Sequence, residues 1–249
     1  MVSKRASLAL LLCAVLLATT SFAATKKSKG RRNRSGGWSD LSRNGDLPNA
    51  GSSVSRARHG NSSLSQDPIG AFWLGGGGNW TNISAWDCDG VHCIPSGDNY
   101  DVNIGVDSGQ GPVNGSVLLD LSPTIHSLTL GNGAQGTLTI ANSYSLTVTD
   151  GVFVGYSGPG GTGTLNIRSG GTLVNQSDGY VSALAGSVGN VNISGSGSQW
   201  NNSGTLYIGD YGQGTLTISS GGVVTSNTTY LGFQSGSSGN VSVSGVGSQ

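Results

Sequence analysis

Apolar and polar residues alternate in five short segments that recur through the second half of the chain. Each segment reads polar-apolar-polar-apolar, and the five lie at 137–140, 164–167, 190–193, 215–218 and 240–243. Their first apolar residues, at positions 138, 165, 191, 216 and 241, are separated by 27, 26, 25 and 25 residues. Period-two alternation rich in Thr, Val and Ile predicts β-strands. A fixed repeat of this length predicts a solenoid.

Each repeat contains more than one predicted strand. Segment 215–218 is followed by a glycine turn, a short strand at 223–225, a turn at Asn227 and another strand at 230–233. Three short strands closed by three corners in about 25 residues form one coil of a parallel β-helix. We therefore predict an all-β fold, a right-handed parallel β-helix (β-solenoid), in which the hand follows from the crossover rule for parallel strands.

The repeat breaks off within a coil. Gly-Ser-Gly-Ser-Gln at 195–199 returns as Gly-Val-Gly-Ser-Gln at 245–249, and Trp200 follows only the first copy. A solenoid that stops there exposes strand edges and apolar core. We expect 113–249 to be β-helix repeats truncated at the C-terminus, or an open end that a capping partner or end-to-end self-association covers.

The first 23 residues have the layout of a secretory signal peptide. Lys4 and Arg5 precede an apolar run at 6–18, and Ser21-Phe22-Ala23 places small residues at the cleavage positions before Ala24. The run is too short for a membrane-spanning helix. No later segment is apolar enough to span a membrane, so we expect no transmembrane segment after cleavage.

Residues 24–69 read as a disordered basic linker. They contain nine Lys or Arg and three Asp, whereas 70–249 contain one Arg and nine Asp. The linker is either a solvated spacer or an electrostatic tether to anionic envelope polymers. We expect no nucleic acid partner, because the linker lacks interleaved aromatic residues and the acidic repeats would repel phosphates.

Residues 70–112 form a Trp-rich segment that we expect to cap the solenoid. Trp73, Trp80 and Trp86 could cover the apolar core of the first coil. Alternatively, they could form a ligand-binding platform on which sugar rings stack. Cys88 and Cys93 would form a disulfide in an exported protein. A metal site with His92 is the alternative, although adjacent His92 and Cys93 suit one ion poorly.

Catalytic groups are sparse in the repeats. Residues 70–249 have no Glu and no Lys, and the strongest acid–base candidates are Asp150 and Asp178 with Arg168 between them. Aspartate also suits corner turns, where it bonds local backbone, and we favour that interpretation. His126 has no evident partner in the sequence, which indicates an ordinary surface histidine. We therefore predict no enzyme activity, no cofactor and no metal.

Two sets of residues resemble a known family. Gly78-Asn79-Trp80, Trp86, Pro95 and Gly97-Asp98 resemble the module that opens autotransporter-like passenger regions. The repeats at 195–200, 206–209 and 214–218 are similar to the repeat associated with type V secretion (autotransporter) and PEP-CTERM proteins. This resemblance covers about 70–249 and implies an exported β-helical passenger on a Gram-negative cell surface, often adhesive.

Three functions are therefore open. The first is an exported structural or adhesive surface protein, a stalk without catalytic activity that is secreted or held at the cell surface. Its partners would be surface glycans or envelope polymers. The second is a carbohydrate-binding module that uses Trp73, Trp80 and Trp86. The third is a polysaccharide-active β-helix enzyme.

Overall fold

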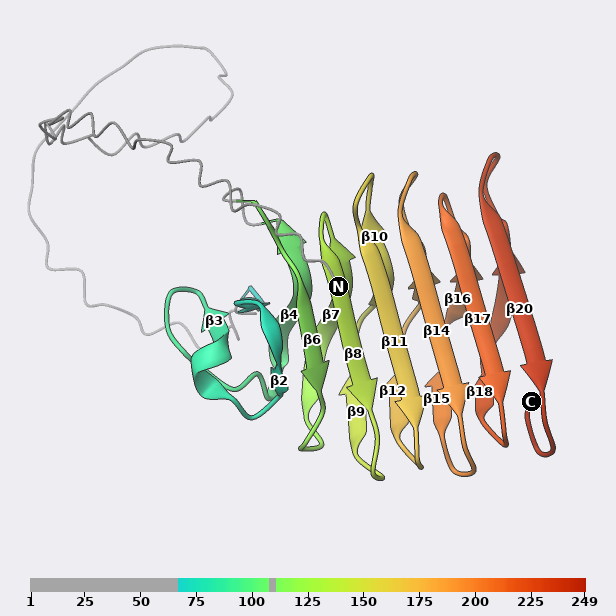
Figure 1. Cartoon of the computed structure of the whole chain (residues 1–249), viewed down its shortest axis with the longest axis horizontal. Coiled ribbons are helices and arrows are strands. Elements are labelled where there is room, and N and C mark those ends of the chain that lie inside the picture. Colours follow the sequence, from blue (N-terminus) through green and yellow to red (C-terminus); the bar gives the residue numbers. More distant parts are fainter. Residues whose placement is uncertain (1–66, 108–110) are drawn as a thin grey trace, which may run out of the picture. The chain divides into compact units, whose positions relative to one another are not determined.

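The computed structural model describes residues 67–107 and 111–249, which form a parallel β-solenoid (Figure 1). The described part holds twenty strands and one short 3-10 helix, η1 (Ile83–Ala85). This confirms the predicted all-β solenoid, and its hand stays a prediction. The predicted signal peptide at 1–23 and linker residues 24–66 lie outside the described residues.

The first sheet contains seven strands, each hydrogen-bonded to the strand one coil away. In spatial order they are β2 (Gly76–Asn79), β6 (Gly115–Leu118), β8 (Gln135–Ile140), β11 (Thr162–Arg168), β14 (Val188–Ser194), β17 (Gln213–Ser219) and β20 (Ser238–Ser244). The last five are the alternating segments of the sequence. β2 and β6 continue the same face towards the N-terminus, so the solenoid begins before the recognised repeat.

The other two sides of the coil belong to a second sheet. One side holds β9 (Ser145–Val148), β12 (Thr172–Asn175), β15 (Gln199–Asn202) and β18 (Val223–Thr225). The other side, which we call the third face, holds β10 (Val152–Ser157), β13 (Gly179–Val181), β16 (Thr205–Ile208) and β19 (Thr228–Leu231). The long strand β7 (Thr124–Asn132) pairs with both β9 and β10 and so joins the two sides.

Four further strands complete the N-terminal end of the second sheet. They are β1 (Ile69–Trp73), β3 (Trp86–Cys88), β4 (Gly97–Asp107) and β5 (Pro112–Val113). β1 pairs in parallel with β4 and antiparallel with β3, and β4 pairs in parallel with β7. The predicted Trp-rich segment therefore contributes paired strands to the solenoid.

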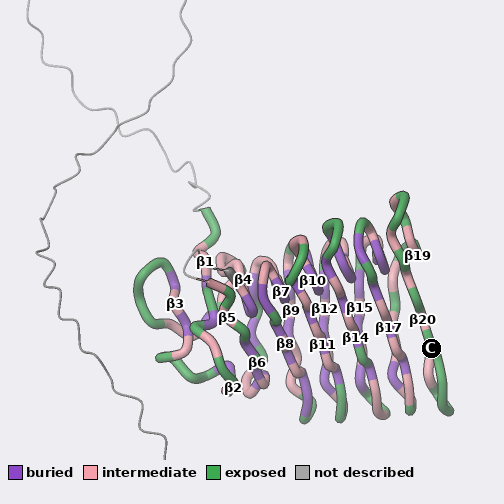
Figure 2. Tube along the Cα trace, turned by 45° about the horizontal axis from the view of Figure 1, so that its top comes forward, coloured by how far each residue is buried: buried purple, intermediate pink, exposed green. Residues whose placement is uncertain are grey.

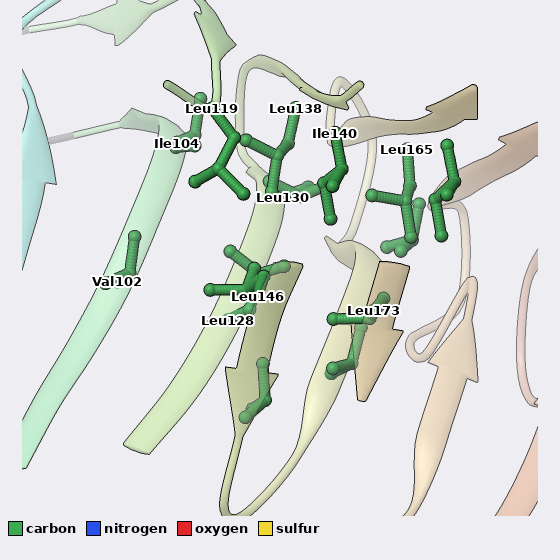
Figure 3. Close-up of a cluster of buried hydrophobic side chains, with 14 of the residues drawn as sticks. Val102, Ile104, Leu119, Leu128, Leu130, Leu138, Ile140, Leu146, Leu165 and Leu173 are labelled. Carbon is green, nitrogen blue, oxygen red and sulfur yellow. The ribbon is translucent and has the colours of Figure 1, made fainter. Parts of the chain in front are cut away.

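The core is a set of apolar ladders that run along the solenoid. Leu138, Leu165, Val191 and Leu216 are direct partners on successive strands of the first sheet, and all four are buried. Figure 2 shows burial alternating along these strands, and Figure 3 shows leucine and isoleucine side chains packed inside the coils. Burial of these side chains is the main favourable term in folding.

Successive strands of the first sheet, from β6 to β20, each have a glycine at the same aligned position. Gly115, Gly136, Gly163, Gly189, Gly214 and Gly239 are aligned partners in the first sheet. A Cβ added at Gly163 would overlap the amide nitrogen of Gly155 and lie 2.6 Å from the carbonyl oxygen of Leu130. Since these atoms are backbone, they cannot rotate away. The row therefore marks where the first sheet contacts the backbone of the third face.

Candidate functional site

The three tryptophans that the sequence offers as a ligand-binding platform lie in the core at the N-terminal end of the solenoid. Trp73 is 2% exposed, and Trp80 and Trp86 are 0% exposed. The Trp86 ring centroid lies 5.0 Å from that of Trp73 and 5.0 Å from that of Trp80. Each indole N–H donates to a backbone carbonyl, those of Gly76, Pro95 and Trp80 respectively. Sugar stacking needs an exposed ring face, so this geometry favours the capping role.

A disulfide joins Cys88 to Cys93, with Cα atoms 6.0 Å apart. This agrees with the sequence prediction. The neighbouring His92 places Nδ1 2.8 Å from the carbonyl oxygen of Trp86. Within 67–107 and 111–249, no group of three His, Cys, Asp or Glu side chains is arranged to hold a metal ion.

The structure does not assemble the acid–base candidates Asp150, Asp178 and Arg168. Asp178 accepts a hydrogen bond from the backbone N–H of Thr205 at 2.7 Å, one coil away. Arg168 is the last residue of β11 on the first sheet, whereas both aspartates precede strands of the third face. Arg168 forms no ion pair with any described residue. Asp178 thus bonds the backbone of the neighbouring coil, whereas the corner-turn interpretation predicts a bond to the backbone of its own turn.

His126 has a partner that sequence reasoning missed. Its Nδ1 lies 2.8 Å from Oδ1 of Asp101, and both side chains are about one-third exposed (34% and 36%). The Ser127 hydroxyl donates to the same carboxylate oxygen at 2.6 Å. The register of β4 and β7, in which Asp101 pairs with Ser127, brings the three together. The Ser127 hydroxyl and the His126 imidazole thus both bond the Asp101 carboxylate and not each other, so the three do not form a Ser–His–Asp relay.

An outward row of aromatic side chains crosses the third face. Phe153, Tyr180, Tyr207 and Tyr230 are direct partners on β10, β13, β16 and β19, and we call this row the aromatic ladder. Successive ring centroids are 5.1, 5.0 and 5.5 Å apart, with interplanar angles of 8°, 4° and 19°. Sequence reasoning missed the ladder, although its residues recur at intervals of 27, 27 and 23 positions.

Further aromatic and acidic groups adjoin the ladder. Phe233 packs edge-on against Tyr207, and its side chain is 47% exposed. Burial is the main cause that raises the pKa of Tyr180, followed by the nearby carboxylate of Asp178. Burial also raises the pKa of Asp210. The ladder is thus an aromatic surface with negative charge beside it.

The first sheet carries a second outward surface, which we call the amide groove. It is an open hollow of about 320 Å³ lined by Thr139, Asn166, Arg168, Asn192 and Ser194. The Asn192 amide donates to the Asn166 carbonyl oxygen at 3.0 Å. A second hollow of about 260 Å³ extends towards β6 and β2 and shares Thr139 and Arg168. This surface offers hydrogen bonds and one positive charge, which suits binding.

No helix in the described part of the chain combines the length and apolar character needed to cross a membrane.

Comparison with known proteins identifies no family for this chain. No family model matches the chain, and no curated protein or solved structure is detectably similar to it.

Proposed function

We propose that the protein is an exported structural or adhesive element of a bacterial surface, a stalk that presents binding surfaces and does not catalyse a reaction. The observation that carries this proposal is the unbroken parallel register of the first sheet from β2 to β20. Every strand in that series is hydrogen-bonded to its neighbours. Such a stack suits a stiff spacer, because each coil supports the next.

The arrangement of side chains supports binding over catalysis. The outward rows of the first sheet are mainly Thr, Asn and Ser, and the Asp178 carboxylate accepts a hydrogen bond from a backbone amide. The carboxylates of Asp150 and Asp178 and the guanidinium of Arg168 belong to different sides of the coil. Acid–base catalysis needs such groups to converge on one substrate. In this protein the candidate groups lie on different sides of the coil and do not converge.

Export rests on the sequence of residues 1–23 and on the disulfide. Disulfides persist in oxidising compartments, so the Cys88–Cys93 bond is consistent with transfer out of the cytoplasm. Cys13, the third cysteine, falls in the predicted signal peptide. Cleavage before Ala24 would therefore leave a chain without a free thiol.

The test is production of the full chain in a Gram-negative host, followed by N-terminal sequencing and thiol titration. We expect the mature chain to start at Ala24 and to show no free thiol until a reductant is added. It should also be labelled on intact cells by a membrane-impermeant reagent. The control variant Leu11→Arg places a charge in the apolar run and should remain uncleaved inside the cell. An uncleaved, reduced wild-type chain in the cytoplasm would refute export.

Adhesion needs a separate measurement. The purified mature chain should be retained on isolated outer-membrane and cell-wall material, and unfolding the chain with urea should abolish retention. Retention that survives unfolding would show that the folded surfaces are not responsible.

A further inference from the structure

The charge on the first sheet differs from that on the rest of the described chain. Its seven strands contain a single charged residue, Arg168, and no aspartate. Beyond residue 69 the chain has nine Asp and no other Lys or Arg. Arg168 is therefore the one Lys or Arg in the described part of the chain, and it lines both the amide groove and the adjoining hollow.

Arg168 is free to bind a ligand. Its side chain is exposed, forms no ion pair with any described residue and donates no hydrogen bond within the described part of the chain. A guanidinium presents a planar set of donors that matches a carboxylate with two parallel hydrogen bonds. An unpaired Arg beside neutral hydrogen-bonding groups thus favours a ligand that carries a carboxylate.

The neighbouring side chains add neutral hydrogen-bonding groups at regular spacing. Asn166 and Arg168 both point outward from β11, two residues apart. Their direct partners on β14 are Asn192 and Ser194. Because one Asn192 N–H donates to the Asn166 side-chain oxygen, the two Asn166 N–H donors, the second Asn192 N–H and the Asn192 side-chain oxygen remain free for a ligand. Amide and hydroxyl groups of this kind pair with the hydroxyls of a sugar.

The two hollows that meet at Arg168 indicate an extended ligand. They share Thr139 and Arg168 and together span strands from β2 to β14. A ligand that fills both would cross several strands, each about 4.8 Å from the next. One cation is too few for nucleic acid, which is bound through many phosphate contacts.

We propose that the amide groove binds an acidic polysaccharide, with Arg168 pairing with the carboxylate of a uronate residue and Asn166, Asn192 and Ser194 bonding the sugar hydroxyls. This inference rests on the proposed surface function and names the class of ligand that the surface would bind. The binding can be measured on purified protein, so its failure is distinguishable from a failure of export.

The test is calorimetric titration of the full chain, at physiological salt, with oligomers of galacturonate, glucuronate and mannuronate. We expect at least one oligomer to bind, and Arg168→Gln to weaken its binding at least about tenfold. Methyl esterification of the same oligomer, which removes its charge, should cause a similar loss. Arg168→Lys should give an intermediate affinity, because it keeps the charge and loses the planar pair of donors.

A matched control separates the groove from general charge attraction. Arg168→Gln combined with Asn227→Arg restores the net charge at the exposed corner between β18 and β19, away from the groove, and should not restore the affinity. Asn166→Ala removes the amide donors while it keeps the Arg168 charge, so it should also weaken binding, and unchanged circular dichroism should show that each variant folds. Absence of binding to all three oligomers would overturn the proposal. Recovery of wild-type affinity in the Arg168→Gln, Asn227→Arg double variant, or equally tight binding of inorganic phosphate, would also overturn it.

Discussion

Tyr180 and Tyr207 stack with almost parallel rings, 5.0 Å between centroids and 4° between planes, although 27 residues separate them in the chain. The two are direct partners in the pairing of β13 with β16. A slip of one residue in this pairing would turn one ring towards the core. The stack therefore depends on the same register that aligns the apolar core.

Removal of Tyr207 should destabilise the solenoid measurably. Its ring contacts Tyr180, Tyr230 and Phe233, and aromatic pairs add stability beyond the area they bury. We expect Tyr207→Ala to lower the free energy of unfolding by about 1–2 kcal/mol, measured by urea denaturation. Thr129→Ala, which changes the same outward row on β7, is the control and should cost less. Equal effects of the two variants would show that the stacked rings add nothing.

Tyr180 should make stability depend on alkaline pH. Burial and the Asp178 carboxylate raise its pKa above the ordinary tyrosine value. The folded state therefore holds this proton more tightly than the unfolded state, so its contribution is complete below about pH 10 and is lost as pH rises further. The difference in tyrosinate absorbance between wild type and Tyr180→Phe should show titration above the ordinary range. Titration of Tyr180 at the ordinary value would contradict this assignment.

Two glycines offer a matched test of the glycine row. Gly163→Ala would force a Cβ against the backbone of Gly155 and Leu130, and we expect a loss of at least about 3 kcal/mol or failure to fold. Gly158→Ala is the control, because the nearest atom to its added Cβ, the Ala185 carbonyl oxygen, lies 3.7 Å away. Thermal unfolding of both variants measures the contrast. A stable Gly163→Ala variant would show that the close contact is absent.

The capping role of the tryptophans predicts weak quenching by acrylamide. Trp73, Trp80, Trp86 and Trp200 are all at most 2% exposed. Replacement of Trp38 by Phe leaves only these four indoles. We expect their emission to be blue-shifted and poorly quenched until the protein is unfolded. Strong quenching in the folded Trp38→Phe variant would revive the sugar-stacking hypothesis for Trp73, Trp80 and Trp86.

The fold was predictable because the alternation of apolar and polar residues in the core strands shows both that they are strands and which side chains face the core. Leu165 and Ile167 alternate with Thr164 and Asn166, and the same order recurs one coil later. β2 escaped recognition because its sequence, Gly-Gly-Gly-Asn, has no apolar residue to alternate. Its place in the sheet is set by pairing with β6, a long-range contact that local pattern does not encode.

The candidate surfaces were harder to predict, because each depends on which outward residues become neighbours. Asp101 and His126 are 25 positions apart, and the irregular register between β4 and β7 brings them together. The aromatic ladder could have been found from the recurrence of Phe153, Tyr180 and Tyr207 at equal intervals. The sequence presents Arg168 only as a catalytic candidate, because the hollow around it forms only once the coils are stacked.

The shared register of the coils has a consequence for how such a protein changes length. Because each coil pairs only with the coils before and after it, one complete repeat could be gained or lost while the remaining pairs stay aligned. Duplication of the gene segment that encodes one repeat would then lengthen the molecule by one strand spacing, about 4.8 Å. Duplication would also copy the outward rows, so reach and the number of contact points would grow together.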